Sequence, residues 1–222
     1  MVCSVFAILF ALFDKTYNSY FWLSKIFSGG VLWLSGIKLK VTGLENLEKN
    51  GTYIVVSNHS SQFDIPAMQL AIPVRMSIVF KKELAKIPLF GWQLYLGPYV
   101  MIDRKKSEDA VKSIERAKYL MKEKNVSILL FAEGTRSKNG EIQPFKRGAF
   151  YLASRVGYPI VPVSISGAQK ILPKGSLRIK PGVLYLHFDK PIETSGIETR
   201  QDEINLMQNV RDIVVKNYQM QE

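Results

Sequence analysis

Cysteine is almost absent from this chain of 222 residues, which contains Cys3 and no second one. A single thiol cannot form a disulfide within the chain, and it leaves no cysteine-based metal site. The His, Cys and carboxylate residues do not occur at metal-ligand spacings, so we expect no bound metal. The simplest compartment for such a chain faces the cytosol.

Acidic residues are also few, with 19 Asp and Glu against 30 Lys and Arg, and the formal net charge is +11. Such an excess suits nucleic acid, an anionic membrane surface or phosphorylated substrates. The sequence contains no helix-turn-helix, RNA-recognition or zinc-finger pattern. We therefore expect a membrane surface and phosphate groups as partners, and no nucleic acid.

Apolar runs long enough to span a bilayer are lacking too. Residues 2–13 are almost wholly apolar and end at Asp14, whereas a spanning helix needs ~20 such residues. A second, aromatic-rich stretch over residues 20–37 is interrupted by Lys25 and by two glycines. No charged segment precedes the first run and no small-residue cleavage site follows it, so we expect no signal peptide.

Residues 1–38 are therefore interpreted as two short helices that lie in or dip into one leaflet, on the cytoplasmic face of the inner cell membrane. The alternative is a pair of ordinary core helices. Residues 39–222 would form one well-buried domain. Aromatic residues favour the membrane interface, and those expected there are Trp22, Trp33, Tyr17 and Tyr20.

Strand and helix patterns alternate through the middle of the chain, which predicts an α/β fold with a mostly parallel, layered sheet flanked by helices. The predicted strands cover residues 39–42, 53–57, 75–80, 99–102, 126–132, 160–165, 177–180 and 183–188. The predicted helices are 65–72, one capped by Ser107 that reaches Met121, 149–155 and 202–218, the last with Ile204, Met207, Val210, Ile213 and Val214 facing inward.

The segment Asn58-His59-Ser60-Ser61-Gln62-Phe63-Asp64 places an imidazole and a carboxylate five positions apart, directly after a predicted strand. In a regular helix two such positions are ~140° apart and do not meet. His59 must lie in the loop and Asp64 in the first turn of the next helix if they are to touch. Asp64 would then orient His59 and fix its tautomer. The alternative is a polar loop with a solvated histidine and a capping aspartate. The other histidine, His187, alternates within a predicted strand and receives no role.

Three further blocks lie at residues 97–104, 131–137 and 159–163, and in the first two a charged residue, Arg104 or Glu133, follows an apolar run. Ligands of an open parallel sheet collect outside the carboxyl ends of its strands. We therefore expect His59, Arg104 and Glu133 to converge on one pocket, although they are far apart in the sequence.

Together with the first block, these segments resemble the four blocks of the glycerolipid acyltransferases, closest to the bacterial 1-acyl-glycerol-3-phosphate acyltransferases. The resemblance runs from about Tyr53 to about Pro191 and includes residues 144–150. Ala132 departs from the family, which usually has proline there. This difference removes a φ constraint but no chemical group.

The resemblance implies that Arg104 and the stretch Glu133-Gly134-Thr135-Arg136 hold a glycerol phosphate, with Lys146 as a helper. Gly134 permits a close backbone approach, Thr135 can donate its hydroxyl, and the planar guanidinium of Arg136 suits a phosphate.

His59 is the candidate general base, which would take a proton from the acceptor hydroxyl as this attacks the thioester of an acyl donor. The serine of a hydrolytic triad is thereby replaced by the acceptor, and Ser60 and Ser61 are expected to satisfy backbone groups at the helix start. Candidates for stabilising the oxyanion are Lys81 or Lys82, or backbone N–H groups near Gly148.

The expected reaction transfers a fatty acyl group from acyl-CoA or acyl-carrier protein to the sn-2 hydroxyl of 1-acyl-glycerol-3-phosphate, giving phosphatidic acid without a further cofactor. The nearest alternative is the same chemistry on glycerol-3-phosphate or another lysolipid. The alternative from a different class is a non-catalytic basic protein that binds anionic lipid or nucleic acid by charge. Such a binder has no need for His59 and Asp64.

Overall fold

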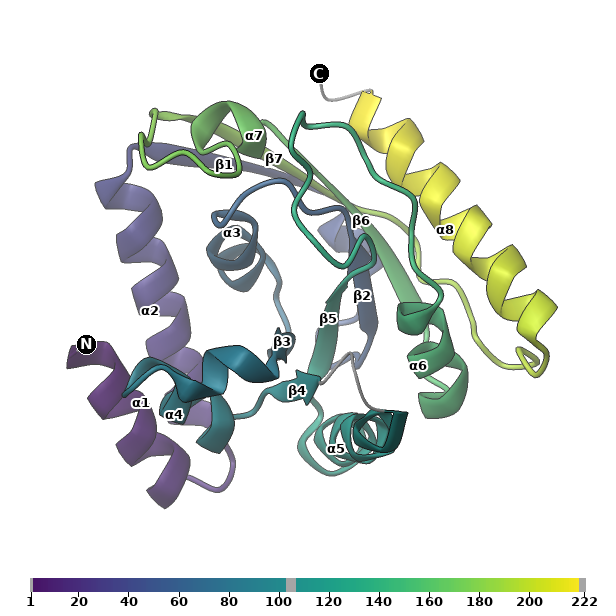
Figure 1. Cartoon of the computed structure of the whole chain (residues 1–222), viewed down its shortest axis with the longest axis horizontal. Coiled ribbons are helices and arrows are strands. Elements are labelled where there is room, and N and C mark those ends of the chain that lie inside the picture. Colours follow the sequence, from purple (N-terminus) through teal and green to yellow (C-terminus); the bar gives the residue numbers. More distant parts are fainter. Residues whose placement is uncertain (1, 103–106, 220–222) are drawn as a thin grey trace.

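The computed structural model describes residues 2–102 and 107–219, and within these ranges seven strands form one sheet in the order β1-β7-β6-β2-β5-β3-β4 (Figure 1). The strands are β1 Ile37–Thr42, β2 Ile54–Ser57, β3 Met76–Lys81, β4 Val100–Ile102, β5 Ser127–Phe131, β6 Ile160–Ser166 and β7 Gly182–Phe188.

Most strand pairs are parallel, as predicted. Neighbouring strands from β6 to β4 pair in parallel, as do β1 and β7, whereas β6 and β7 are antiparallel. The carboxyl ends of β6, β2, β5, β3 and β4 consequently lie along one edge of the sheet. The polar blocks follow these ends, so the topology gathers them there.

Helices cover both faces of the sheet (Figure 1). On one face lie α2 and α3, and on the other α5, α6 and α8. The helices of the described ranges are α1 Val2–Phe13, α2 Asn18–Leu34, α3 Asp64–Ala71, α4 Phe90–Leu96, α5 Ser107–Lys124, α6 Gly148–Val156, α7 Ala168–Ile171 and α8 Arg200–Gln219, with the 3₁₀ turns η1 Leu44–Asn46 and η2 Lys82–Lys86.

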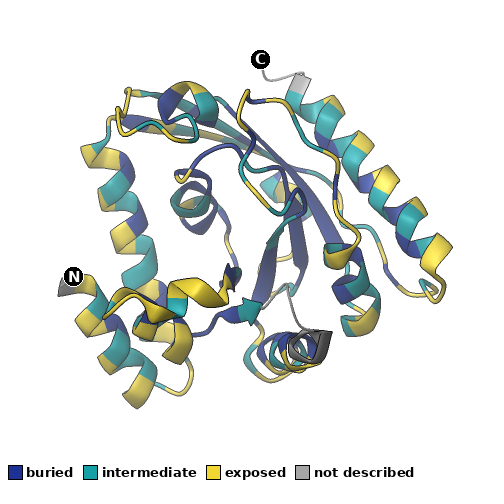
Figure 2. Ribbon diagram, in the orientation of Figure 1, coloured by how far each residue is buried: buried dark blue, intermediate teal, exposed yellow. Residues whose placement is uncertain are grey.

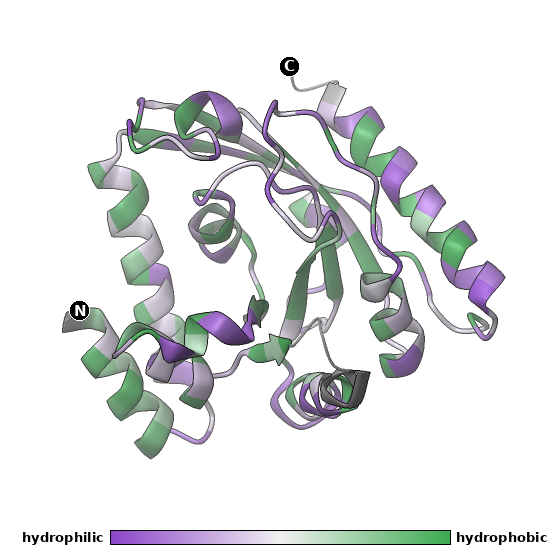
Figure 3. Cartoon of the chain, viewed as in Figure 1, coloured by the Kyte–Doolittle hydropathy of each residue, from purple (hydrophilic) through white to green (hydrophobic). Residues whose placement is uncertain are grey.

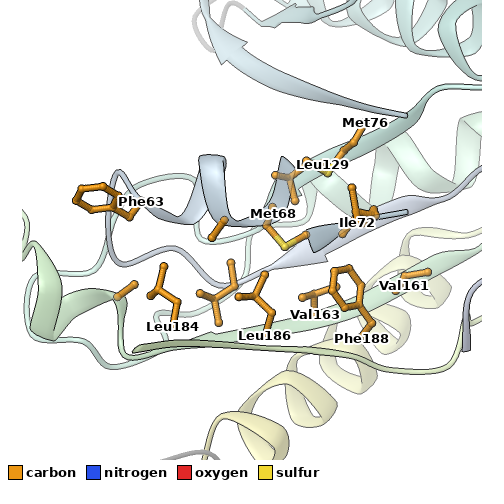
Figure 4. Packing of buried hydrophobic residues seen from close by; sticks show 14 of the residues in the cluster. Phe63, Met68, Ile72, Met76, Leu129, Val161, Val163, Leu184, Leu186 and Phe188 are labelled. Carbon is orange, nitrogen blue, oxygen red and sulfur yellow. The ribbon is translucent and has the colours of Figure 1, made fainter. Parts of the chain in front are cut away.

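Strand β2 shows how the two faces are filled. Val55 joins the apolar cluster under α3, while Ile54 and Val56 join the cluster under α5, α6 and α8, and all three are fully buried. Successive side chains of a strand point to opposite faces, so a strand covered on both sides is apolar throughout. Figure 2 shows the central strands buried along their length, and Figure 4 shows Met68 of α3 and Ile72, which follows this helix, packed over Leu186 and Phe188 of β7.

The two predicted N-terminal helices are present, and α2 packs into the core. Its side chains Leu32, Phe21 and Tyr20 belong to three different apolar clusters. The predicted domain boundary after residue 38 falls inside β1, and the division itself stays a prediction. Among the described residues, no helix combines the length and apolarity needed to cross a membrane.

One predicted interfacial residue was placed wrongly. Tyr20 is 2% exposed; its ring packs edge-to-face on Tyr99 and its hydroxyl donates to Gln93 in α4. The buried hydroxyl thus has its partner inside the protein, as a buried tyrosine requires. Trp22 and Trp33, by contrast, are exposed.

The segment 177–180 is not a strand, contrary to expectation. Leu177 is 97% exposed, and the N–H of Lys180 donates to the carbonyl of Ile171 instead of to a neighbouring strand. The next strand of the sheet, β7, begins only at Gly182, directly after Pro181, and lies between β1 and β6. The short elements η1, η2, α4 and α7 were not predicted.

Helix α8 is present, but its inward face differs in part from the prediction. Leu206, Val210 and Val214 are its buried apolar residues, whereas Ile204 and Ile213 are half-buried. Positions four apart lie on one face of a helix, so the 206–210–214 series defines the side that packs on the sheet.

Candidate functional site

His59 and Asp64 are in direct contact, in the arrangement that their spacing predicted. His59 lies in the loop after β2, and Asp64 is the first residue of α3. The Nδ1 atom of His59 is 2.7 Å from Oδ2 of Asp64. The side chain of Asp64 is fully buried, while that of His59 is 15% exposed. The imidazole is therefore oriented from behind by a buried carboxylate and retains one accessible edge.

The same oxygen of Asp64 also organises the loop. Oδ2 accepts hydrogen bonds from the backbone N–H groups of Ser60 and Ser61, at 2.8 and 2.9 Å. Both N–H groups belong to the loop before α3, so the carboxylate at the first residue of the helix fixes the loop that contains His59. The hydroxyl of Ser61 accepts from the N–H of Phe63 and donates to the carbonyl of Leu172. Ser61 thus satisfies backbone groups, as expected.

Asn58 attaches the loop that contains His59 to the next strand of the sheet. Its side-chain nitrogen donates to the carbonyl of Ile165 in β6, and its side-chain oxygen accepts the N–H of the same residue, both at 2.8 Å. These two hydrogen bonds connect the chain to β6 directly beyond the end of β2, where the backbone pairing of the two strands has stopped. The loop therefore has a fixed position relative to β6.

Glu133 contacts the backbone of His59. Its Oε1 accepts the N–H of His59 at 2.6 Å, and its Oε2 accepts the N–H of Gln143 at 3.0 Å. The residue is 2% exposed. Burial raises the pKa of this carboxyl group to about 7, against the opposing effect of the two N–H donors. The structure thus brings Glu133 into contact with the backbone of His59, and Arg104, the third residue expected at the same pocket, lies outside the described residues.

The turn after β5 contains Gly134 and is contacted by two lysines. Gly134 has φ +72°, and a Cβ there would lie 3.2 Å from Cδ of Lys146. Nζ of Lys174 donates to Oγ1 of Thr135 at 3.1 Å and to the carbonyl of Arg136 at 2.7 Å. Three cationic side chains, from Arg136, Lys146 and Lys174, thus surround one short turn.

A cavity of about 1110 Å³ opens beside His59. We call the part of the cavity lined by residues that follow β2, β5 and β6 its polar end, and the part lined by α1, α2, η2 and α4 its apolar end. Most of its exposed lining is apolar. A cavity that combines cationic side chains with a mostly apolar lining suits an amphiphile with a charged head group.

Most of the predicted site residues line this cavity. Glu133 does not, because its carboxylate is turned to the backbone of His59 and Gln143. No group of three or more His, Cys, Asp or Glu side chains within residues 2–102 and 107–219 is arranged to hold a metal ion. The predicted residues on the cavity wall are His59, Lys81, Gly134, Thr135, Arg136 and Lys146.

Lys174 also lines the cavity and was missed by sequence reasoning. It belongs to the segment Pro173-Lys174-Gly175, which begins ten positions after the fourth block ends. A lysine between proline and glycine predicts an exposed turn and gives no hint of a partner. Its contacts to Thr135 and Arg136 bridge 39 and 38 positions of sequence.

The chain is similar to known acyltransferases in sequence and in structure. A family model described as Acyltransferase matches residues 38–166. The 1-acyl-sn-glycerol-3-phosphate acyltransferase of Limnanthes douglasii is 34% identical over 194 residues, which cover 86% of this chain and 67% of the relative. The 1-acyl-sn-glycerol-3-phosphate acyltransferase alpha of Homo sapiens is 34% identical over 181 residues, covering 82% of this chain and 64% of the relative.

Among solved structures, the crystal structure of the 1-acyl-sn-glycerophosphate acyltransferase PlsC from Thermotoga maritima superposes with a TM-score of 0.81 at 26% identity. The match covers 97% of this chain and 87% of that one. The sheet, the order of the polar blocks and these similarities agree: the chain belongs to the acyltransferase family.

Proposed function

We propose that this protein transfers a fatty acyl group from acyl-CoA or acyl-carrier protein to the sn-2 hydroxyl of 1-acyl-glycerol-3-phosphate, producing phosphatidic acid. The observation that carries the proposal is the His59–Asp64 pair at the junction of a cationic and an apolar part of one cavity. The relatives named for this activity cover most of the chain and support the choice of acceptor.

His59 acts as the general base in this proposal. Asp64 engages Nδ1, so Nε2 is the nitrogen available to the acceptor hydroxyl. As the hydroxyl oxygen attacks the thioester carbonyl carbon, its proton passes to Nε2 and the carbonyl oxygen becomes an oxyanion. Collapse of this intermediate breaks the carbon–sulfur bond, and the imidazolium returns the proton to the leaving thiolate. Positioned proton transfer of this kind contributes about 10²–10⁴ in rate.

The acceptor phosphate is assigned to the cationic end of the cavity. Arg136 offers paired N–H donors, and the lysines Lys146 and Lys174 line the same wall. Thr135 adds a hydroxyl. Arg104 keeps its predicted part in phosphate binding on the strength of its block alone. Lys81 stays a candidate for stabilising the oxyanion, and it lies on the cavity wall at the end of β3.

The apolar end of the cavity is assigned to acyl chain, and the helices around it to the membrane. Large apolar side chains are exposed on α1 and α2, including Phe13, Trp33 and Leu34, and Figure 3 shows the hydrophobic character of α1. Contact of these side chains with the cytoplasmic leaflet would let the acceptor keep its chain near hydrocarbon while its phosphate reaches Arg136.

The test is release of free thiol from acyl-CoA when 1-acyl-glycerol-3-phosphate is added. We expect release by the wild type and its loss in His59→Ala. The matched control is His187→Ala, because this second histidine lies in β7 and its Nδ1 contacts Thr42. A His59→Ala protein with normal thiol release would refute the role of His59 as general base. Repeating the assay with glycerol-3-phosphate and with other lysolipids identifies the acceptor, and parallel assays with acyl-carrier protein identify the donor.

A further inference from the structure

The last residue of β5 and the segment that follows it contact His59 at three different points. The ring of Phe131 stacks on the imidazole with centroids 3.9 Å apart and planes 15° from parallel. The N–H of Ser137 donates to the carbonyl of His59 at 2.8 Å. Glu133 accepts the N–H of His59 at 2.6 Å. The ring, the carbonyl and the amide of one residue are thus all held by a stretch about 75 positions away in the sequence.

Both oxygens of Glu133 are used in these internal contacts. Oε1 takes the N–H of His59 and Oε2 takes that of Gln143. A carboxylate that bound the acceptor would have to face the cavity, and Glu133 is buried and absent from the cavity wall. Its negative charge would also repel a phosphate. The geometry therefore separates Glu133 from its neighbours Gly134, Thr135 and Arg136, which do line the cavity.

We propose that Glu133 is a positioning residue, whose carboxylate fixes the backbone of His59 so that the imidazole is aligned between Asp64 and the acceptor hydroxyl. The inference rests on the proposed function, because it takes His59 as the base. Two N–H donors converge on Glu133, and an ionised carboxylate offers acceptors only. The amide of glutamine would turn its own N–H₂ toward one of the two donors, so it can satisfy one contact and not both.

Ionisation of Glu133 should be visible in the chemical shift of the His59 amide proton. Burial and the nearby carboxylate of Asp64 raise its pKa, while the N–H groups of His59 and Gln143 and the guanidinium of Arg211 lower it, and the result is about 7. The ionised form accepts the N–H of His59 more strongly than the neutral form. The amide proton of His59 should therefore move downfield as pH rises through neutrality, and Glu133→Gln should abolish that movement.

The kinetic test uses the full chain and steady-state assays with acyl-CoA and 1-acyl-glycerol-3-phosphate. We expect Glu133→Gln to lower kcat about 10- to 100-fold, since small displacements of a reacting group cost that much, and to change the acceptor KM less than twofold. A tenfold or larger rise in KM at normal kcat would make Glu133 an acceptor ligand and overturn the inference. Unchanged kcat and KM would overturn it as well.

The matched control is Glu203→Gln. Glu203 is another buried glutamate, on α8, whose Oε2 accepts from Nη1 of Arg147 at 2.6 Å. It does not line the cavity. The substitution tests what loss of a buried, bonded carboxylate does to the fold alone, and we expect kcat to stay within threefold of wild type. An equal fall of kcat in both variants would identify a general loss of folding and overturn the specific role of Glu133.

The second test measures the backbone amide signal of His59 in the wild-type protein. The chain has two histidines, so labelling with ¹⁵N-histidine yields two backbone amide signals in a proton–nitrogen correlation spectrum. We expect one amide, assigned to His59 through a His187→Gln protein, to lie far downfield and to titrate between pH 5 and pH 9. The ring nitrogens report the titration of the imidazole separately. A His59 amide proton without the downfield position and without a pH response would overturn the inference.

The two proposals fail in different ways. If His59→Ala keeps its activity, His59 is not the base, whatever the amide signal of His59 shows. If His59→Ala is inactive while Glu133→Gln has normal kcat, the proposed function stands and the positioning role of Glu133 is refuted.

Discussion

The two ends of the cavity are built in opposite ways. At the polar end, His59 is held by directional contacts from the first residue of α3 and from the end of β5 with the loop after it: Asp64, Phe131, Glu133 and Ser137. At the apolar end, α1 and α4 pack together and leave large apolar side chains exposed, among them Phe6, Leu9, Trp92 and Tyr95. Hydrogen bonds depend on angle and distance, whereas apolar burial depends mainly on area.

This difference matches what each end is proposed to do. Proton transfer requires donor and acceptor within about 3 Å, so the polar end must be rigid. A flexible acyl chain requires apolar surface of sufficient extent, and small shifts of its wall are tolerated. Substitutions at the polar end should therefore change the steady-state kinetics strongly. Substitutions at the apolar end should change binding to membranes by smaller factors.

The largest effect is expected at Asp64. Asp64→Asn keeps an oxygen for the N–H groups of Ser60 and Ser61 but removes the charge that stabilises the imidazolium. We expect kcat to fall about 10²- to 10⁴-fold, with circular dichroism unchanged. The measurement is steady-state thiol release. A variant within threefold of wild type would contradict the pairing of Asp64 with a charged His59.

The next effect concerns the phosphate end. Arg136→Glu should raise the acceptor KM about 10- to 100-fold, because a charge-assisted hydrogen bond is lost and a repulsive charge is introduced. Arg178→Glu is the control: it makes the same change of net charge on an exposed side chain that does not line the cavity. Equal KM values for the two variants would show that only overall charge matters.

A smaller effect is expected from the apolar end. Phe13→Ser, at a position 82% exposed on α1, should weaken binding to anionic vesicles about tenfold, since burying such a ring gains about 1.5–3 kcal/mol when complete. Val111→Ser, 61% exposed on α5, should leave binding unchanged. Vesicle sedimentation measures both. Equal binding of Phe13→Ser and wild type would remove α1 from the membrane contact. Single substitutions are preferable to deletion of residues 1–38, which would remove core residues of α2.

The smallest effect is a pH dependence of stability. The pKa of Glu133 is raised from 4.5 to about 7 in the folded protein, so the folded state binds the extra proton and its stability falls as pH rises through that window. Glu133→Gln lacks this loss. The Tm of the wild type should therefore fall more between pH 5 and pH 8 than that of the variant, by a few degrees. Parallel Tm profiles would contradict the raised pKa.

Much of the fold could be predicted from local patterns. The apolar runs before His59 and Glu133, and the run that contains Pro162, predicted three buried strands that pair in parallel, since an uninterrupted apolar run fits a strand covered on both faces. The segment 177–180 was predicted wrongly for the same local reason. Its residues resemble those of a strand, but Leu177 is exposed and the N–H of Lys180 donates to the carbonyl of Ile171.

The candidate site was predictable in its residues more than in their roles. The contact between His59 and Asp64 could be predicted from their spacing, because the loop and the start of the helix are adjacent in the chain. Glu133 and Lys174 are different. Each is defined by a partner far away in sequence, the amide of His59 for one and Thr135 for the other. Tyr20 was misplaced because its partner Gln93 lies 73 positions away.

The sequence by itself determined the type of chemistry: an imidazole with a carboxylate five residues later, basic residues after buried strands, and apolar helices at the start. Only the tertiary structure decided which groups face the cavity and which hold others in place. The physical reason is that strand periodicity and helix starts are set by neighbouring residues, whereas the direction of a buried carboxylate is set by whichever N–H groups the folded sheet brings to it.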